Sequence, residues 1–419
     1  MGAIVLSLDY RESLDFLFPR TTQIKFGLDT THALLDALGN PERQFASVHV
    51  AGTNGKGSVA TLVAEALGAA GFRVGLYTSP HLVSFRERIR VDGAPISEDA
   101  VAAWTTLLHP VIEATAATFF EATTAIAFAD FAARGVEIAV VEVGLGGRLD
   151  STNVIQPLVS VVTHIALDHQ KYLGETIAAI AGEKAAIAKA GVPFVIGERD
   201  PAVVAVLIES ATAAIRARPN QGELQPIVVP PEAMWEGRLG LLGPHQRRNA
   251  AVAAAALAVL PAPFTVPPEA RAAAFARARL PGRLDRRGRW LFDVAHNLDG
   301  MLALTAALSE LRPPGPVHGL VSILGDKAWP AMLVELDRVL DLGILTVAPS
   351  ADTRRWDLGW LERWLADPSR PAARARWRLV PDFVEALREA EQGAGTVVVT
   401  GSFHTVGDVM VARGLDVLG

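Results

Sequence analysis

Short apolar runs alternate with segments of helical periodicity along the first 280 residues. The apolar runs are rich in β-branched residues and predict strands at residues 45–50, 73–77, 137–143, 158–165 and 193–196. Between them, apolar residues recur at helical spacing over residues 97–116, 123–134 and 176–190. Because strands that alternate with helices pair in parallel, this part of the chain is predicted to be an α/β unit with a mostly parallel sheet.

A second, smaller series of the same kind follows the sequence Leu280-Pro281-Gly282-Arg283. Its strand-like runs include W-L-F-D-V-A-H and V-V-V-T-G-S, and its expected helices lie at residues 299–311, 328–340 and 356–366. We therefore predict two α/β domains, residues 1–282 with a P-loop-type sheet and residues 283–419 with a Rossmann-like sheet. The proline-rich stretch 216–242 predicts an antiparallel annex or a surface excursion.

A glycine-rich loop lies between the first predicted strand and the helix after it. The sequence V-A-G-T-N-G-K-G-S-V contains three glycines, which permit a backbone that points several N–H groups at one anion. Lys56 adds a positive charge there. The spacing differs from the usual G-x-x-x-x-G-K-[ST] motif, because only Thr53 and Asn54 separate the first two glycines. We interpret the loop as a phosphate site in preference to an ordinary glycine turn.

Composition narrows the class of protein. The 419 residues carry a formal net charge of -6, which argues against nucleic acid or an anionic membrane as the main partner. The chain has no cysteine, so a metal ion must be held by oxygen or imidazole ligands. The first residues lack the basic and apolar regions of a signal peptide, and the Ala-rich stretch 250–260 is too short to span a bilayer. The cytoplasm is the expected location.

Polar residues end three of the predicted strands, at the edge where open parallel sheets bind their ligands. Ser79 follows the second strand, Glu142 lies at the end of the third, and His169 follows the fourth. Oxygen and imidazole ligands suit Mg²⁺, which keeps its other positions for water and phosphate. Each residue alone is explained as a helix cap, an ion-pair partner or a donor to a carbonyl. Together, beside a phosphate loop, they predict a magnesium site.

Lys184, in the sequence G-E-K-A-A-I, is expected on a helix near the same corner. A lysine cation there would repel Mg²⁺, whereas a neutral amine can take up CO₂ and become an anionic carbamate. The other interpretation is a solvated lysine paired with Glu183 or Glu175. The residues by themselves leave both interpretations open.

The second domain has two polar clusters at strand ends, Asp293-Val-Ala-His296-Asn297 and Gly401-Ser402-Phe403-His404. They predict that this domain closes over a nucleotide bound by the first. The chain contains no G-x-S-x-G nucleophile elbow. The sequence G-L-G-G-R differs from the dinucleotide fingerprint G-x-G-x-x-G, so a dinucleotide site is poorly supported.

Taken in order, these motifs resemble the folylpolyglutamate synthase/dihydrofolate synthase family of the Mur ligase group. The resemblance rests on H-V-A-G-T-N-G-K-G-S, Y-T-S-P-H-L, E-V-G-L-G-G-R-L-D-S-T-N, I-A-L-D-H, E-K-A-A-I, L-P-G-R, F-D-V-A-H-N and T-G-S-F-H-T-V. It implies that ATP phosphorylates the carboxylate of dihydropteroate or of a folate's terminal glutamate, and that the amine of L-glutamate attacks the acyl phosphate. Residues 1–282 would be the ATP- and folate-binding domain and residues 283–419 the glutamate-ligase domain.

The resemblance also implies roles for individual residues. Those expected at the reacting centre are Lys56, carbamylated Lys184 and His296. The ligands expected for Mg²⁺, two ions in all, include Ser79, Glu142 and His169. ATP is expected to contact Thr53, Asn54, Gly55, Lys56, Gly57, Ser58, Asn249, Arg283 and Asp293. The substrate is expected to contact Lys25, Phe26, Gly27, Thr118, Phe119, Phe120, Glu121, Asp150, Ser151, Thr152, Ser402 and His404.

The implied partners are small molecules, namely dihydropteroate, reduced folates and L-glutamate, used by a monomer. Lys25-Phe26-Gly27 departs from the pattern of some bifunctional members, which have an acidic residue there, so Glu121 or Asp150 must accept the pterin N–H groups. The alternatives are a folylpolyglutamate synthase alone, or another Mur-type amino-acid ligase. A cell-wall Mur ligase needs a nucleotide-sugar domain before the loop, where only about fifty residues stand. A non-catalytic ATP switch would leave the clusters of the second domain unexplained.

Overall fold

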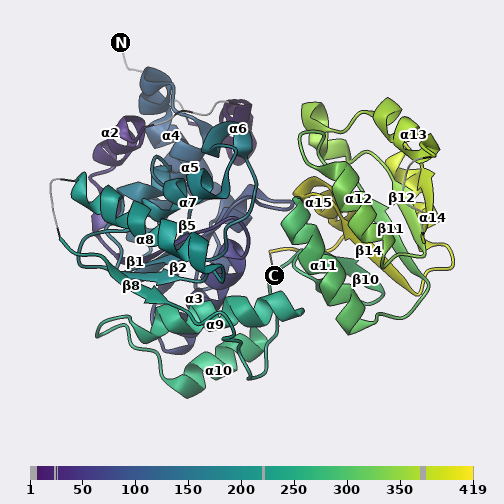
Figure 1. The fold of residues 1–419 in the computed structure, drawn as a ribbon. Helices are drawn as coiled ribbons and strands as arrows, with labels where there is room; N and C mark the ends of the chain where they lie inside the picture. The colour runs from purple at the N-terminus through teal and green to yellow at the C-terminus, as the bar shows by residue number, and fades with distance from the viewer. Residues whose placement is uncertain (1–6, 23–24, 26, 219–221, 369–373, 419) are drawn as a thin grey trace, which may run out of the picture.

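The chain folds into two bodies, each built around its own sheet (Figure 1). The computed structural model describes residues 7–22, 25, 27–218, 222–368 and 374–418. The described strands up to residue 228 form an eight-stranded sheet, and those from residue 285 onward form a six-stranded sheet. We call the first body, with helices α1–α10, the N-terminal unit, and the second, with helices α11–α15, the C-terminal unit.

The sheet of the N-terminal unit has the strand order β4-β3-β2-β5-β1-β6-β7-β8. The six strands from β2 to β8 in that order are parallel, and the pairs β2–β3 and β3–β4 are antiparallel. The strands are β1 Ala46–Ala51, β2 Val74–Tyr77, β3 Ile89–Val91, β4 Ala94–Pro95, β5 Ile138–Glu142, β6 Val159–Val162, β7 Pro193–Ile196 and β8 Gln225–Val228. The central strand β1 thus ends directly before the glycine-rich loop.

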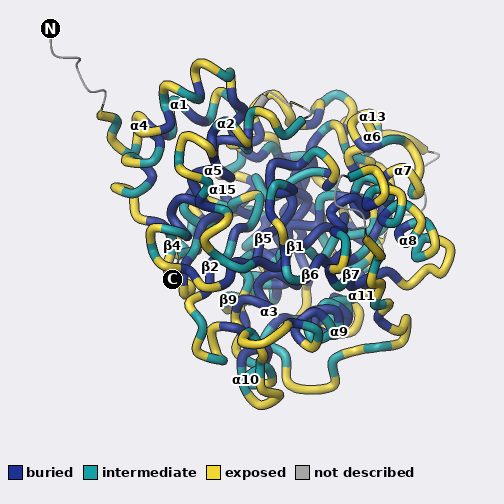
Figure 2. Tube along the Cα trace, turned by 90° about the vertical axis from the view of Figure 1, so that its left-hand side faces the viewer, coloured by how far each residue is buried: buried dark blue, intermediate teal, exposed yellow. Residues whose placement is uncertain are grey.

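Helices cover both faces of this sheet, because alternate residues of its buried strands are apolar on each side. Val48 and Val50 of β1 pack with α3, α9 and α10, whereas Ala51 packs with α7 and α8 on the other face. In Figure 2 the central strands run through the buried interior. The helices are α1 Tyr10–Leu17, α2 Asp29–Ala37, α3 Lys56–Ala69, α4 Glu98–Thr115, α5 Phe119–Ala133, α6 Gln170–Leu173, α7 Ile177–Ala185, α8 Pro201–Arg216, α9 Pro244–Ala258 and α10 Pro268–Arg277. The 3₁₀ helices are η1 Phe18–Thr22, η2 Pro41–Arg43, η3 Phe85–Arg88 and η4 Ser151–Val154.

The sheet of the C-terminal unit has the order β13-β12-β11-β14-β10-β9 and is parallel except for the β9–β10 pair. Its strands are β9 Asp285–Arg287, β10 Trp290–Phe292, β11 Val317–Val321, β12 Leu342–Leu345, β13 Arg376–Leu379 and β14 Thr396–Thr400. Its helices are α11 Leu298–Leu311, α12 Trp329–Asp337, α13 Leu358–Ala366, α14 Phe383–Glu391 and α15 Phe403–Ala412, with the 3₁₀ helix η5 Pro349–Arg354. No helix in the described ranges is both long and apolar enough to cross a bilayer.

The predicted α/β class is confirmed, and two local predictions are wrong. For the stretch 216–242, the antiparallel annex is wrong, because among its described residues β8 pairs in parallel with β7 at the sheet edge, where a proline is tolerated. The alternative, a surface excursion, agrees with the structure, because most of the described residues after β8 are exposed or half-buried. Helix α5 begins at Phe119, four residues before the predicted start. The Thr118 hydroxyl accepts from Glu121 N while the Glu121 carboxylate accepts from Thr118 N, and this capping box fixes the earlier start.

Candidate active site

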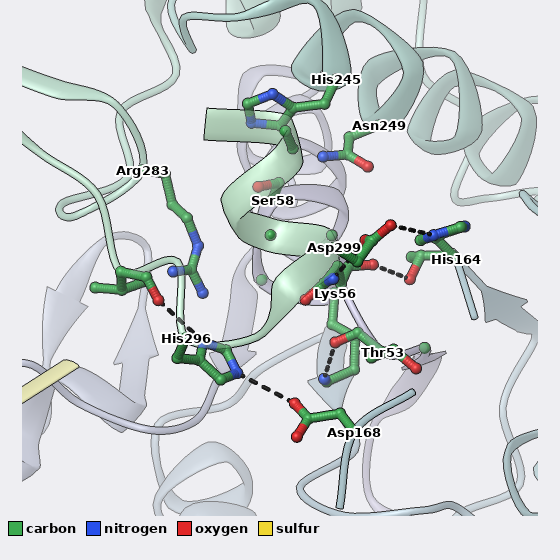
Figure 3. A pocket seen from close by; sticks show the side chains of 18 of the residues that line it. Thr53, Lys56, Ser58, His164, Asp168, His245, Asn249, Arg283, His296 and Asp299 are labelled. Atoms are coloured by element: carbon green, nitrogen blue, oxygen red, sulfur yellow. Dashed lines mark hydrogen bonds and ion pairs between the residues drawn. The ribbon is translucent and has the colours of Figure 1, made fainter. Parts of the chain in front are cut away.

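A cavity of about 410 Å³ lies between the two units, at the carboxyl ends of the parallel strands of the first sheet (Figure 3). A volume of this order is typical of a small-molecule site. The predicted ATP, metal and reacting-centre residues all line it: Thr53, Asn54, Gly55, Lys56, Gly57, Ser58, Ser79, Glu142, His169, Lys184, Asn249, Arg283, Asp293 and His296. The fold therefore brings together residues that are far apart in the sequence.

The glycine-rich loop is packed so tightly against the end of β6 that it needs its glycines. Gly52 has a φ of 148°, and a Cβ there would lie 1.9 Å from the Thr163 hydroxyl oxygen. That hydroxyl donates to Asn54 O at 2.7 Å, and Thr53 N donates to His164 O at 2.6 Å. These contacts hold the loop in one conformation, so its free N–H groups are positioned before a ligand arrives.

Helix α3 begins at Lys56 and directs its N-terminus into the cavity. Its N-cap, Gly55, has a left-handed backbone and offers no side-chain cap, so the first N–H groups of the helix stay available for an anion. Among the described residues, Lys56 Nζ donates only to Thr53 O, at 3.2 Å, which keeps the amine beside the loop (Figure 3). A helix N-terminus, glycine-loop amides and a lysine together form a phosphate site.

Glu142 is a buried carboxylate at the end of β5 that makes no direct ion pair with any described residue. Its oxygen accepts Ser79 N–H at 3.2 Å, and none of the ion pairs among the described residues includes it. Burial raises its pKa, and this effect outweighs the opposing charges of Lys56, Arg283 and Arg88. A cation placed here would restore the lost stabilisation, so the position fits a metal ion.

The imidazole of His169 is suited to the same cation. Although the side chain is 41% exposed, partial desolvation, assisted by the charge of Lys327, outweighs the opposing charge of Asp168 and lowers the pKa of His169 to about 4. The ring is therefore neutral at pH 7, as a metal ligand must be. Across the described residues, no group of three or more His, Cys, Asp or Glu side chains is placed to hold a metal. An ion at this site would therefore combine Glu142 and His169 with the Ser79 hydroxyl and with ligands that the protein does not supply.

Lys184 is buried on α7 and faces the cavity with no acceptor among the described residues. The solvated-lysine interpretation is wrong, because the side chain is 5% exposed and Glu183 pairs with Arg148 at 2.9 Å. Burial, aided by the charge of Lys56, lowers the pKa of Lys184 to about 7. A large fraction of this amine is consequently neutral near pH 7.

Two residues predicted to bind ATP, Arg283 and Asp293, lie at the start of the C-terminal unit. The Asp293 carboxylate accepts from Leu284 N and from Ala295 N, both at 2.9 Å, which fixes the strand end. The Arg283 guanidinium lies 5.0 Å from the centre of the Phe403 ring. On the opposite wall, the Asn249 amide lies so near Gly55 that a Cβ there would be 2.6 Å from its oxygen.

Asp168 joins the two units at the edge of the cavity. Its carboxylate accepts from Asn297 Nδ2 at 3.0 Å and pairs with Lys327, and His296 Nε2 lies 3.5 Å away (Figure 3). The phosphate loop makes a second junction, because Asn54 Nδ2 donates to Asp299 at 2.7 Å. Sequence reasoning missed Asp299 and Lys327, because a carboxylate in the first turn of a helix and a lysine in a loop are ordinary surface features until the fold is known.

His164 strengthens this second junction as a charged group. It lies between Glu198, 2.9 Å from Nδ1, and Asp299, 3.3 Å from Nε2. Burial lowers its pKa, but the hydrogen bonds and charges of the two carboxylates outweigh burial and raise the pKa to about 10. The imidazolium therefore links the end of β6 to α11 at neutral pH.

The raised pKa of His164 makes the stability of the fold pH-dependent. Since the folded pKa exceeds the ordinary value of 6.5, the stabilisation is complete below about pH 6.5 and is lost as the pH rises through about 10. We expect the melting temperature to fall less steeply between these pH values in His164→Gln than in the unsubstituted chain. His32→Gln, which changes an exposed histidine on α2, serves as the control. If the melting temperatures of all three proteins change with pH in the same way, His164 does not stabilise this junction as a cation.

The predicted substrate residues lie outside the lining of this cavity, and several have structural partners. Lys25 Nζ donates to Thr115 O and Ala116 O at the end of α4. The Phe119 ring stacks on Phe18 with centroids 5.6 Å apart. A Cβ at Gly27 would have no neighbour within 4 Å, Phe26 lies outside the described residues, and the Phe120 ring packs directly against Gly144.

The carboxylates considered for pterin recognition are both engaged. Glu121 Oε2 accepts from Thr118 N and Oγ1, and Asp150 accepts from the N–H groups of residues 144, 145 and 152 and from the Thr152 hydroxyl. The Thr152 hydroxyl also contacts His49 at 2.8 Å, and Ser151 is buried beside it in η4.

In the C-terminal unit, two further predicted substrate residues are bonded to protein. Ser402 caps α15, accepting from Thr405 N at 3.1 Å. His404 Nδ1 contacts the Ser350 hydroxyl at 2.9 Å. Their substrate roles stay predictions.

Comparison with known proteins gives a consistent result. Residues 50–257 match the model of the Mur ligase middle domain. The chain is 34% identical over 422 residues to the dihydrofolate synthase/folylpolyglutamate synthase of Bacillus subtilis, covering 92% of this chain and 94% of that protein. The structure of Escherichia coli FolC in complex with DHPP and ADP superposes with a TM-score of 0.82 at 30% identity, over 97% of this chain and 98% of that one.

A second solved structure contains more of the expected ligands. It is a bifunctional folylpolyglutamate synthase/dihydrofolate synthase with Mn, AMPPNP and L-glutamate bound. It matches with a TM-score of 0.80 at 29% identity, covering 97% of this chain and 98% of that chain.

Proposed function

The chain belongs to the dihydrofolate synthase/folylpolyglutamate synthase family, and from that premise we propose that it is an ATP-dependent ligase that adds L-glutamate to dihydropteroate and to reduced folates. The observation that carries the proposal is that one cavity is lined by three groups of residues. They are the glycine-rich loop, Glu142 with its neighbours at the strand ends of the first sheet, and the residues at the strand ends of the C-terminal unit. Glutamate-dependent release of ADP by the purified protein, with dihydropteroate or a reduced folate as acceptor, tests it.

The first step transfers the γ-phosphoryl group of ATP to the substrate carboxylate, which brings two anions together. Lys56, the loop N–H groups and the N-terminus of α3 hold the phosphates and stabilise the charge that develops during transfer. Asn249, Arg283 and Asp293 complete the nucleotide site from the other walls of the cavity. Because these groups come from both units, the units must stay together while phosphate is transferred.

We assign the metal site to Ser79, Glu142 and His169, with Mg²⁺ as the ion and ATP phosphate as a further ligand. The unpaired, buried Glu142 carboxylate and the neutral His169 ring support this assignment. The bound ion supplies positive charge to the phosphates. The number of ions, two, is carried over from the family resemblance.

Lys184 is proposed to react with CO₂ through its neutral amine, forming an N–C bond and releasing one proton. The carbamate would place a negative charge, in place of the positive charge of a lysine, beside the proposed metal site. The burial of the amine, its pKa of about 7 and its lack of an acceptor among the described residues support this proposal. Arginine could not do this, which gives a reason for a lysine in a chain whose basic residues are mostly arginines.

The second step is attack of the glutamate amine on the acyl phosphate, which forms the amide and releases phosphate. We place His296 at this step, because its ring lies at the interface of the two units, where Asp168 and the Val294 carbonyl orient it. The predicted substrate positions at residues 25–27, 118–121 and 150–152 and at Ser402 and His404 belong to this part of the proposal. The domain limits 1–282 and 283–419, a monomeric state and a cytoplasmic location are proposed with it.

The substrate range gives a separate prediction. We expect both dihydropteroate and tetrahydrofolate to support glutamate-dependent ADP release, with dihydropteroate the weaker, because Lys25 offers donors where a pterin needs acceptors. A steady-state ADP assay with each acceptor measures the two activities, and a UDP-muramyl acceptor serves as the negative control. If dihydropteroate stays at background while tetrahydrofolate is used, the protein is a folylpolyglutamate synthase alone.

A further inference from the structure

His81 and Arg88 form a hydrogen-bonded pair beside the candidate active site. Arg88 Nε donates to His81 Nδ1 at 2.8 Å, and the guanidinium carbon lies 5.1 Å from the centre of the Phe119 ring. Arg88 is buried at the end of η3, and none of the ion pairs among the described residues includes it. Its neighbour Glu87 is occupied by the backbone N–H groups of residues 82–84. The His81 ring is thus the acceptor for a buried cation.

This contact determines which nitrogen of His81 carries the hydrogen. A guanidinium has donors only, so Nδ1 of His81 must be the acceptor, and the ring carries its hydrogen on Nε2. The described residues offer Nε2 no hydrogen-bond partner, and this atom is not fully buried. Nε2–H is therefore an unused N–H donor.

His81 lies between the cavity, the start of α5 and the C-terminal unit. It follows Ser79 and Pro80, which line the cavity. Its ring is 6.1 Å from Phe18, and Phe18 stacks on Phe119 at the start of α5. On the other side the loop meets the C-terminal unit, because a Cβ on Gly407 of α15 would lie 2.2 Å from Leu82 O.

We propose that His81 contacts the substrate through Nε2–H, donating a hydrogen bond to the benzoyl amide oxygen of a folate acceptor, and that Arg88 is the positioning residue that fixes this tautomer. The inference rests on the proposed function and adds a residue to it. Phe18 and Phe119 supply apolar walls of the kind that pack against a planar ring.

The test compares His81→Leu with His81→Gln, because the glutamine amide places an N–H donor near the position of Nε2. At saturating ATP and glutamate, we expect the KM for tetrahydrofolate to rise about tenfold in His81→Leu, the effect of one lost hydrogen bond. His81→Gln should recover most of the loss, with kcat little changed and the affinity for MgADP unchanged in both. His32→Leu, an exposed histidine on α2, is the matched control.

Arg88→Leu provides a second, independent measurement. It should raise the same KM, and combining it with His81→Leu should add little, since both changes remove one interaction. An unchanged KM in His81→Leu, or equal losses in His81→Leu and His81→Gln, would overturn the inference. The proposed function fails separately, namely when the unsubstituted protein releases no ADP with any folate acceptor.

Discussion

Lys56→Ala is expected to lower the rate of glutamate-dependent ADP release by at least about a hundredfold, because it removes a cation that stabilises the phosphates during transfer. The fold should persist, since the one hydrogen bond of Lys56 Nζ within the described part of the chain is to Thr53 O. Steady-state ADP release together with circular dichroism measures both effects. The change should also weaken the binding of MgADP.

Lys171→Ala is the matched control, because Lys171 is an exposed lysine on α6 and should leave ADP release unchanged. Lys56→Arg separates charge from shape. It keeps the positive charge but replaces a compact amine with a planar fork, and we expect little recovery in a loop packed as closely as this one. A folded Lys56→Ala protein with near-normal ADP release would contradict the role of this loop in phosphate transfer.

Lys184→Ala is expected to be nearly inactive, because it removes the anion that the proposed carbamate would supply. Lys184→Glu should retain part of the activity, since its carboxylate carries the same charge. Removal of dissolved CO₂ at mildly acidic pH should lower the activity of the unsubstituted protein, and bicarbonate should restore it. The variants should not respond to bicarbonate.

The chain contains its own control for this modification. Lys189 is also buried and has a pKa lowered to about 7 by burial, but its Nζ donates to the backbone oxygen and to the side-chain oxygen of Asn153, each at 2.9 Å. With carbon-13 bicarbonate, we expect one carbamate signal, lost in Lys184→Ala. A spectrum with no such signal, or with a signal that survives Lys184→Ala, contradicts the assignment.

The α/β class and the grouping of strand-end residues around one cavity could be predicted from the sequence, because both depend on short local patterns. Ser79, Glu142 and His169 follow buried parallel strands, and the carboxyl ends of such strands necessarily lie at one edge of the sheet. Glycine spacing likewise identifies a loop whose backbone is constrained. The proposed phosphate and metal positions were predictable from these two rules.

Contacts between the units could not be predicted in this way. Asp299, Lys327 and His164 have no motif of their own and gain their positions from the packing of α11 and its neighbours against the end of β6. The two possible states of Lys184 also required the fold, because only burial and the Arg148–Glu183 pair exclude a solvated lysine. Long-range packing decides such features.

One measurement tests the central claim directly, namely that ATP activates a substrate carboxylate for attack by glutamate. The purified protein is incubated with ATP, L-glutamate and dihydropteroate or tetrahydropteroylglutamate whose reacting carboxylate is labelled with oxygen-18, and the released phosphate is analysed by mass spectrometry. Transfer through an acyl phosphate predicts one labelled oxygen in each phosphate, together with a product extended by one glutamate. Unlabelled phosphate would show that ATP is hydrolysed by water and would contradict the proposed ligase.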